Sequence, residues 1–111
     1  MNFSIKEISE GTKHYLELSG ELDAFTAPEL REKLIPLVEQ GGHTVIVDLS
    51  EVTYMDSTGL GVFVGAIKAE NKHQSEIILK NMTQRVRRLF DITGLDEIFN
   101  IQDDKTKGGL K

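Results

Sequence analysis

The chain has 111 residues, and its 13 Lys and Arg residues against 18 Asp and Glu residues give a formal net charge of −5 at pH 7. A chain of this length has enough surface to bury for one hydrophobic core, so we expect a single domain over residues 1–111 with a short frayed tail at about 104–111. The acidic balance argues against nucleic acid as the main partner, because phosphate backbones are bound chiefly by Lys and Arg side chains.

The composition also limits the setting and the chemistry. The sequence has no cysteine, which excludes disulfides, thiolate metal sites and cysteine nucleophiles. Its apolar runs, such as Val45–Val47, are far shorter than the roughly 20 residues of a membrane helix, and Met1–Lys6 lacks the features of a signal peptide. Because the sequence has neither a membrane helix nor a signal peptide, we expect a cytoplasmic protein with no membrane partner. The acidic residues do not follow a metal-ligand spacing, so we expect no bound metal, and we also expect no cofactor.

The first predicted element is a β-hairpin. Apolar and polar residues alternate over Phe3–Lys6 and again around Leu16 and Leu18, and Glu10–Thr12 interrupts the alternation. Two alternating runs joined by a short glycine-containing break are typical of paired antiparallel strands. The second strand should end at Gly20–Asp23.

A helix is predicted next. Thr26 and Glu29 have the spacing of a capping box, and Pro28 falls in the first turn, where a missing N–H is harmless. Apolar residues then recur at helical spacing and form one stripe that faces a sheet: Leu30, Leu34, Leu37 and Val38. Pro36 within this stripe predicts a bend, and Gly41–Gly42 predicts the end of the helix.

The middle of the chain predicts a buried strand and a second helix. Thr44–Leu49 is a nearly continuous β-branched run, a pattern typical of a central strand covered on both faces. From Ser57 to about Asn71 the apolar residues return to helical spacing: Leu60, Phe63, Val64 and Ile67.

The last third predicts another strand and helix. Glu76–Leu79 reads as a short buried strand, and Thr83–Asp91 as a helix that Gly94 ends and that buries Val86, Leu89 and Phe90. Leu95–Ile101 should hold a helical turn and then an edge strand. Because strands and helices alternate, we predict an α/β fold: a mixed β-sheet with parallel βαβ crossovers packed against about four helices.

Asp56, Ser57 and Thr58 stand where the second helix begins. These residue types are the preferred helix N-caps, so capping is the simplest interpretation of the pattern, although a helix N-terminus also favours a bound anion. Ser57 does not match a hydrolase nucleophile, because Met55 breaks the G-x-S-x-G motif. We place His14 on the exposed face of a strand and the other two histidines, His43 and His73, at element ends on the surface.

Three glycines follow Ser57 on the same predicted helix. Gly59, Gly61 and Gly65 do not fit a nucleotide-binding fingerprint, whose glycines directly follow the first strand. Gly61 and Gly65 lie four residues apart on one face and cost helix propensity, so a close approach by another chain segment should compensate. Internal packing and partner docking both remain open. The only basic cluster, Arg85, Arg87 and Arg88 with Lys80, is interpreted as a solvated face.

Three motifs resemble one known family. Gly20–Asp23, Tyr54–Gly61 and Arg88–Leu95 are similar, in order and spacing, to the STAS domain of bacterial anti-sigma factor antagonists, over nearly the whole chain. The Asp56–Gly65 segment is most similar to the general stress response (RsbV) type.

The resemblance implies a binding protein and not an enzyme. It implies that the domain binds an anti-sigma factor that is also a serine kinase, so that a sigma factor is released. It further implies that phosphorylation of Ser57 blocks binding and that a PP2C-type phosphatase restores it. The resemblance places Glu21, Asp23 and Asp56 with Ser57 on the docking surface. We expect this surface to continue along the start of the second helix, with Thr58, Gly59, Gly61 and Gly65. The alternatives are a STAS module of a stress-signalling scaffold and a small nucleotide-binding domain, with Thr58 as a second candidate for modification.

Overall fold

The computed structural model describes residues 2–103, so the predicted tail at about 104–111 lies outside the described residues. The elements follow in the order β1 (Phe3–Glu10), β2 (Lys13–Leu22), α1 (Ala27–Glu39), β3 (Thr44–Met55), α2 (Ser57–His73), β4 (Glu76–Lys80), α3 (Gln84–Thr93), the 3-10 turn η1 (Leu95–Glu97) and β5 (Asn100–Gln102). The five strands form one sheet in the order β1-β2-β3-β4-β5.

The sheet has the predicted mixed topology. β1 pairs antiparallel with β2, and the pairs β2–β3, β3–β4 and β4–β5 are all parallel. The α/β fold with parallel crossovers is therefore confirmed. The number of helices is smaller than predicted: residues 2–103 contain three α-helices, and the segment after Gly94 forms only the short turn η1 before the edge strand β5.

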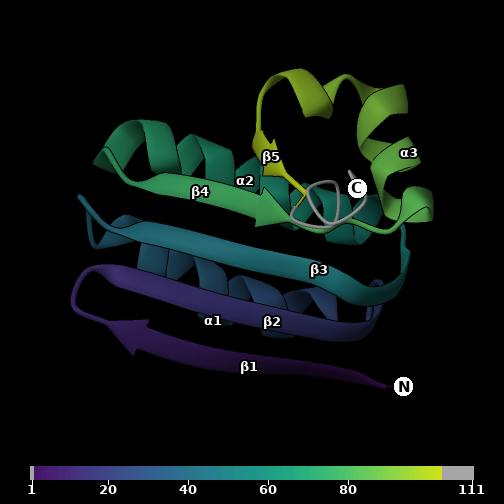
Figure 1. The fold of residues 1–111 in the computed structure, drawn as a ribbon, viewed down its shortest axis with the longest axis horizontal. Helices are drawn as coiled ribbons and strands as arrows, with labels where there is room; N and C mark the ends of the chain where they lie inside the picture. The colour runs from purple at the N-terminus through teal and green to yellow at the C-terminus, as the bar shows by residue number, and fades with distance from the viewer. Residues whose placement is uncertain (1, 104–111) are drawn as a thin grey trace, which may run out of the picture.

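The helices cover one face of the sheet only. In Figure 1 α1 and α2 lie behind the strands, and no helix of residues 2–103 covers the face turned toward the viewer. Along β3, Val45, Val47 and Leu49 are buried against the helices, while the alternating residues Ile46 and Asp48 are half-buried. The prediction of a central strand covered on both faces is thus wrong, because a β-branched run also suits a strand with one packed face.

The core lies between the sheet and the helices. The apolar stripe of α1 is buried as predicted, and α1 continues unbroken past Pro36. Phe63 of α2, Phe90 of α3 and Phe99 meet edge to face, with ring centroids 5.7–6.3 Å apart. These contacts fix α3 and Phe99 against α2. Separately, no helix within residues 2–103 is long and apolar enough to cross a membrane.

The capping box predicted before α1 does not form. Pro28 stands in the first turn as expected, but the Thr26 side chain makes no cap hydrogen bond. Its hydroxyl instead donates to the Glu21 carbonyl oxygen (2.8 Å) and accepts from the Asp23 N–H (2.9 Å). Thr26 is therefore committed to the loop that precedes the helix.

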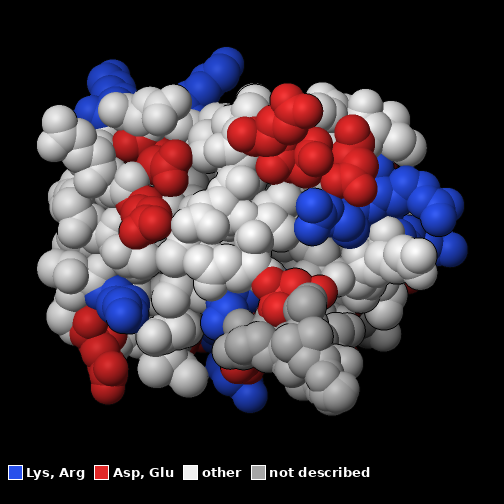
Figure 2. Space-filling view, turned by 45° about the horizontal axis from the view of Figure 1, so that its top comes forward, with Lys and Arg blue, Asp and Glu red and all other residues white. Residues whose placement is uncertain are grey.

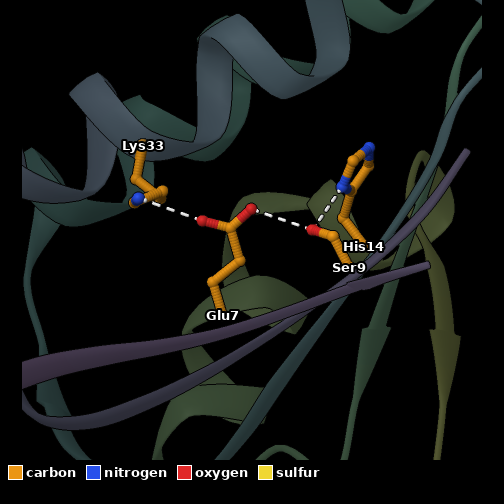
Figure 3. A network of polar contacts seen from close by, with 4 residues as sticks. All are labelled: Glu7, Ser9, His14 and Lys33. Atoms are coloured by element: carbon orange, nitrogen blue, oxygen red, sulfur yellow. Dashed lines mark hydrogen bonds and ion pairs between the residues drawn. The ribbon is translucent and has the colours of Figure 1, made fainter. Parts of the chain in front are cut away.

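His14 is buried, which corrects its predicted exposure. It is 6% exposed and lies on the helix-facing side of β2 with Leu16 and Leu18. Figure 3 shows the polar chain that reaches it: Lys33 contacts Glu7 (3.0 Å), the Ser9 hydroxyl donates to Glu7 (2.9 Å), and Ser9 meets His14 Nδ1 (2.7 Å). Because a hydroxyl carries one proton, His14 Nδ1 must donate to Ser9.

The far side of the His14 ring is also paired. Its Nε2 lies 2.7 Å from Nδ1 of His43, so one proton is shared between the two imidazoles. His43 stands just before β3 and His73 ends α2, both half-buried, so their predicted places at element ends are confirmed. The satisfied hydrogen bonds explain how a histidine occupies a core position.

Candidate functional site

The predicted site residues meet at the carboxyl edge of the sheet. Leu22 pairs with Met55 at the ends of the parallel strands β2 and β3, so Asp23 and Asp56 leave the sheet side by side. The Asp56 N–H donates to the Leu22 carbonyl oxygen (3.2 Å), which joins the two loops directly. In open parallel sheets this edge is where ligands and partners usually bind.

Asp56 forms the N-cap of α2. Its backbone is extended (φ −115°, ψ −172°), and its Oδ1 accepts from the Thr58 N–H (2.9 Å) and the Gly59 N–H (3.3 Å). Two of the N–H groups that lack partners inside the helix are therefore satisfied by the Asp56 carboxylate. The capping role that the pattern offered to three residues belongs to Asp56.

Ser57 is the first residue of α2 and is exposed. Its hydroxyl forms no hydrogen bond with any of residues 2–103. The side chain therefore stabilises neither the helix nor the loop, and its Oγ is accessible at the positive end of the helix dipole. Thr58, the next residue, is also exposed, so accessibility alone does not distinguish the two hydroxyls.

Asp23 organises the neighbouring loop. Its Oδ1 accepts from the Phe25 N–H (2.9 Å) and the Thr26 N–H (3.1 Å), and it lies 3.3 Å from Thr26 Oγ1. The Asp23 carbonyl oxygen accepts from the Ala27 N–H (2.8 Å). One carboxylate oxygen is thus used to hold the loop in a single conformation, while Oδ2 has no hydrogen bond within residues 2–103.

Phe25 is the prominent residue that the sequence analysis missed. Its side chain is 83% exposed, more than any other large hydrophobic residue described. It stands in the turn between β2 and α1, outside the alternating pattern of β2 and the helical pattern of α1. A large apolar residue that fits neither pattern could have been recognised in the sequence as a candidate surface residue. The Asp23 hydrogen bonds hold the Phe25 backbone in place, so the ring is presented from an ordered loop.

The three glycines of α2 have different surroundings. A Cβ on Gly59 would lie 2.7 Å from Leu22 Cγ and 3.0 Å from the Leu22 carbonyl oxygen, so Gly59 lets α2 approach β2 closely. A Cβ on Gly61 or Gly65 would meet nothing within 4 Å. Internal packing therefore accounts for Gly59, whereas the described residues leave open space at Gly61 and Gly65, for which docking stays a prediction.

Glu21 extends the site along the sheet. It is exposed on β2 and pairs in register with Tyr54 of β3, on the face opposite the helices. Gly65 lies at the other extreme, eight residues along α2 from Ser57, or about 12 Å at helical rise. The predicted residues thus extend from Glu21 on the helix-free face, through the two loops at the carboxyl edge, to α2, and Gly59 among them is buried.

The three arginines of the basic cluster lie on α3, and Lys80 ends β4. Arg85, Arg87 and Arg88 are all exposed, and Arg87 Nε contacts Asp91 Oδ1 at 2.9 Å one turn later. Figure 2 shows Lys and Arg side chains gathered at the right of the view with acidic side chains beside them. Such alternating charge is typical of a solvated helix face. Within residues 2–103 no three His, Asp or Glu side chains gather as a metal site would require.

Comparisons with known proteins place this geometry in context. Residues 5–107 match the family model described as the STAS domain. An anti-sigma-B factor antagonist of Bacillus subtilis (strain 168) is 45% identical over 111 residues, covering 100% of both chains. A Staphylococcus epidermidis protein of the same name is 43% identical over 103 residues, covering 93% of this chain and 95% of the relative.

Solved structures share the fold. The Bacillus cell fate determinant SpoIIAA in its phosphorylated form superposes with a TM-score of 0.73 at 24% identity, covering 98% of this chain and 96% of that chain. An anti-sigma factor antagonist from Mycobacterium paratuberculosis superposes with a TM-score of 0.76 at 23% identity, covering 91% of this chain and 86% of that chain.

Proposed function

This chain belongs to the STAS domain family, and we propose that it is an anti-sigma factor antagonist controlled by phosphorylation of Ser57. In its bare form it binds an anti-sigma factor that is also a serine kinase, and the sigma factor is released in the cytoplasm. The same kinase phosphorylates Ser57 and ends binding, and a PP2C-type phosphatase restores it. The 45% identity to an anti-sigma-B factor antagonist over the full length of both chains supports the general function.

The observation that best supports a phosphorylation switch is that Asp56, and not Ser57, caps α2. Because the Asp56 side chain caps the helix, the Ser57 hydroxyl is not needed for the cap, and the Ser57 side chain is exposed. A phosphate there adds about −1.5 to −2 charges at the positive end of the helix dipole. Phosphorylation is therefore compatible with the intact fold.

Loss of binding would then arise at the interface. A phosphoryl group on Ser57 adds bulk and charge next to the Asp56 carboxylate, in a region that the partner must desolvate. Burying an unpaired charge is expensive, and each 1.4 kcal/mol changes affinity about tenfold. A few kcal/mol of this penalty are enough to release the partner.

The docking surface follows from the same geometry. Phe25 provides an apolar ring, with Glu21 and the open Oδ2 of Asp23 as acidic neighbours. Gly61 and Gly65 leave room for a partner segment to approach α2 closely. A complementary partner offers an apolar pocket flanked by basic side chains, since aromatic anchors in pockets dominate binding energy.

Nucleotide binding, one of the two alternatives from the sequence, does not fit the positions of the glycines. Gly59, Gly61 and Gly65 lie inside α2, whereas a phosphate-binding loop needs its glycines between the strand and the helix. The segment between β3 and α2 is the single residue Asp56, which is too short for such a loop.

Titration calorimetry with the anti-sigma factor encoded beside this protein in its genome tests the proposal. We expect the bare chain and Ser57→Ala to bind with similar affinity, and Ser57→Glu to bind at least about tenfold more weakly. Gln40→Glu, at the exposed C-terminal end of α1, adds the same charge at the opposite edge of the sheet and should bind like the bare chain. Absence of binding by the bare chain would overturn the proposed function.

A further inference from the structure

The helix-free face of the sheet carries an apolar row. Ile8, Tyr15, Ile46 and Ile78 pair with one another in register across β1, β2, β3 and β4. Ile8 is 53% exposed and Tyr15 37%, while the two inner isoleucines are half-buried. Figure 1 looks onto this face, with α1 and α2 behind it. A contiguous apolar row on an open sheet is typical of a contact surface.

Charged rows lie on both sides of the apolar row, on the same face. Toward the carboxyl edge, the row that includes Asp48 reads basic, acidic, acidic, basic from β1 to β4: Lys6, Glu17, Asp48 and Lys80. On the other side, the row reads acidic, basic, neutral, acidic on the same strands: Glu10, Lys13, Thr44 and Glu76. Strand by strand, the two rows carry opposite charges on β1, β2 and β4.

Asp48 keeps its charge in this row. Burial works to raise the pKa of its carboxyl, but hydrogen bonds from the Ser50 N–H (2.9 Å) and Asn81 Nδ2 (3.1 Å), with nearby Lys80, outweigh burial and lower the pKa below its ordinary value. The row therefore remains charged at neutral pH.

We propose that this face binds a second copy of the chain about a two-fold axis that runs along the apolar row. Such an axis lays one copy's row of Ile8 and Tyr15 on its partner's and exchanges the two charged rows. Lys6 then faces Glu10 of the second copy, and Glu17 faces Lys13; Lys80 likewise faces Glu76. Each opposite-charge pair occurs twice, and Asp48 faces the neutral Thr44. The surface is self-complementary, as a two-fold interface requires.

The area predicts weak association. Four strands about 4.8 Å apart and three rows about 6.7 Å apart cover roughly 400 Å² on each copy. Stable interfaces bury about 800 Å² on each partner, so this dimer belongs among weak, concentration-dependent ones.

The proposed dimer leaves the Ser57 surface free. Ile46 of the apolar row lies nine residues before Met55 along β3, or roughly 30 Å in an extended strand. The inference therefore stands independently of the proposed function, and dimerisation does not compete with binding of an anti-sigma factor at the carboxyl edge.

Sedimentation velocity from about 10 µM to about 1 mM tests the proposal in the weak-affinity range. We expect the average mass to rise from one chain toward two, and Ile8→Lys to weaken association at least about tenfold. Ile92→Lys, a similar change at a 74% exposed residue on α3, should not alter it. Concentration-dependent amide shifts should map to the three rows. A monomer throughout this range would overturn the proposal.

A charge exchange tests the two-fold register itself. Lys6→Glu and Glu10→Lys each place like charges opposite one another across the interface, so each should weaken association. The double variant restores opposite charges in both copies and should recover most of the wild-type affinity, with folding of each variant checked by thermal melting. A double variant that associates no better than either single one would refute this arrangement.

Discussion

Gly59→Ala distinguishes a packing role for glycine from a docking role. An added Cβ would lie 2.7 Å from Leu22 Cγ, 3.0 Å from the Leu22 carbonyl oxygen and 3.1 Å from Leu22 Cδ2. Leu22 is fully buried, and its carbonyl oxygen accepts from the Asp56 N–H, so neither group can move without disturbing the junction of the two loops. We expect α2 and the end of β2 to separate slightly.

Two terms set the magnitude. Overpacking a well-packed site costs about 1–3 kcal/mol, and replacing a helical glycine with alanine returns at most about 1 kcal/mol. The net loss of unfolding free energy should be about 1–2 kcal/mol, which lowers Tm by roughly 5–10 °C in a domain of this size.

Gly61→Ala is the matched control, because its Cβ would meet nothing within 4 Å on the same helix. This variant gains helix propensity without a clash, so its Tm should rise by a few degrees, up to about 1 kcal/mol of added stability. Thermal melts followed by circular dichroism compare the two. A Tm for Gly59→Ala equal to or above that of Gly61→Ala would refute the packing argument.

Three further predictions follow from the site and from the Glu7 network. Asp56→Ala should lose about 1 kcal/mol of unfolding free energy with the cap, whereas Ser57→Ala should lose almost none, and urea denaturation would contradict the cap assignment if both cost the same. Phe25→Ala should weaken binding to the anti-sigma factor at least about tenfold in calorimetry, with unchanged Tm because the ring is 83% exposed; unchanged affinity would exclude it as an anchor. The Lys33 hydrogen bond, then the Ser9 hydroxyl, hold the pKa of Glu7 below its ordinary value of 4.5, so its stabilisation is present above that pH and is lost as pH falls through the lowered value. Wild type should therefore exceed Glu7→Gln in stability by about 0.5 kcal/mol at neutral pH, and the gap should close in urea titrations as the pH falls below 4.5 and Glu7 becomes protonated; a gap that widens on acidification would contradict the assignment.

Much of the fold was predictable because strands and helices alternate along the chain and each type has its own spacing of apolar residues. The hairpin, the parallel crossovers and the edge strand after Leu95 all follow from apolar periodicity. The second half of β3 did not, because register shifts between Glu17 and Ser19 and between Gly20 and Glu21 break the period of two. Val52, Thr53 and Tyr54 are strand-favouring residues, but their burial does not alternate regularly.

His14 shows how a residue preference can mislead. Strand parity placed it with Leu16 and Leu18 on the inner face, but the usual exposure of histidine suggested the outer one. The structure follows parity, because Ser9 and His43 satisfy both ring nitrogens. A sequence does not show such partners, since they come from β1 and from the start of β3.

The site was located by motif but not resolved by it. Asp56, Ser57 and Thr58 all have cap-forming side chains, so only the backbone conformation assigns the cap to Asp56. The same holds for Thr26, whose hydroxyl is taken by Glu21 and Asp23. Sequence spacing likewise could not distinguish the packed Gly59 from the open Gly61, because the difference depends on Leu22, at the end of β2, lying against Gly59 only.

Locating the phosphate most directly tests the central claim that Ser57 is the switch. The chain is incubated with the neighbouring anti-sigma factor kinase and ATP, the modified residue is mapped by mass spectrometry, and the affinity of each form for the kinase is measured. We expect one phosphate on Ser57, none on Ser57→Ala, undiminished labelling of Thr58→Ala, and at least a roughly hundredfold loss of affinity on modification. Stoichiometric labelling of Ser57→Ala, or equal affinity of the phosphorylated and bare forms, would contradict the account.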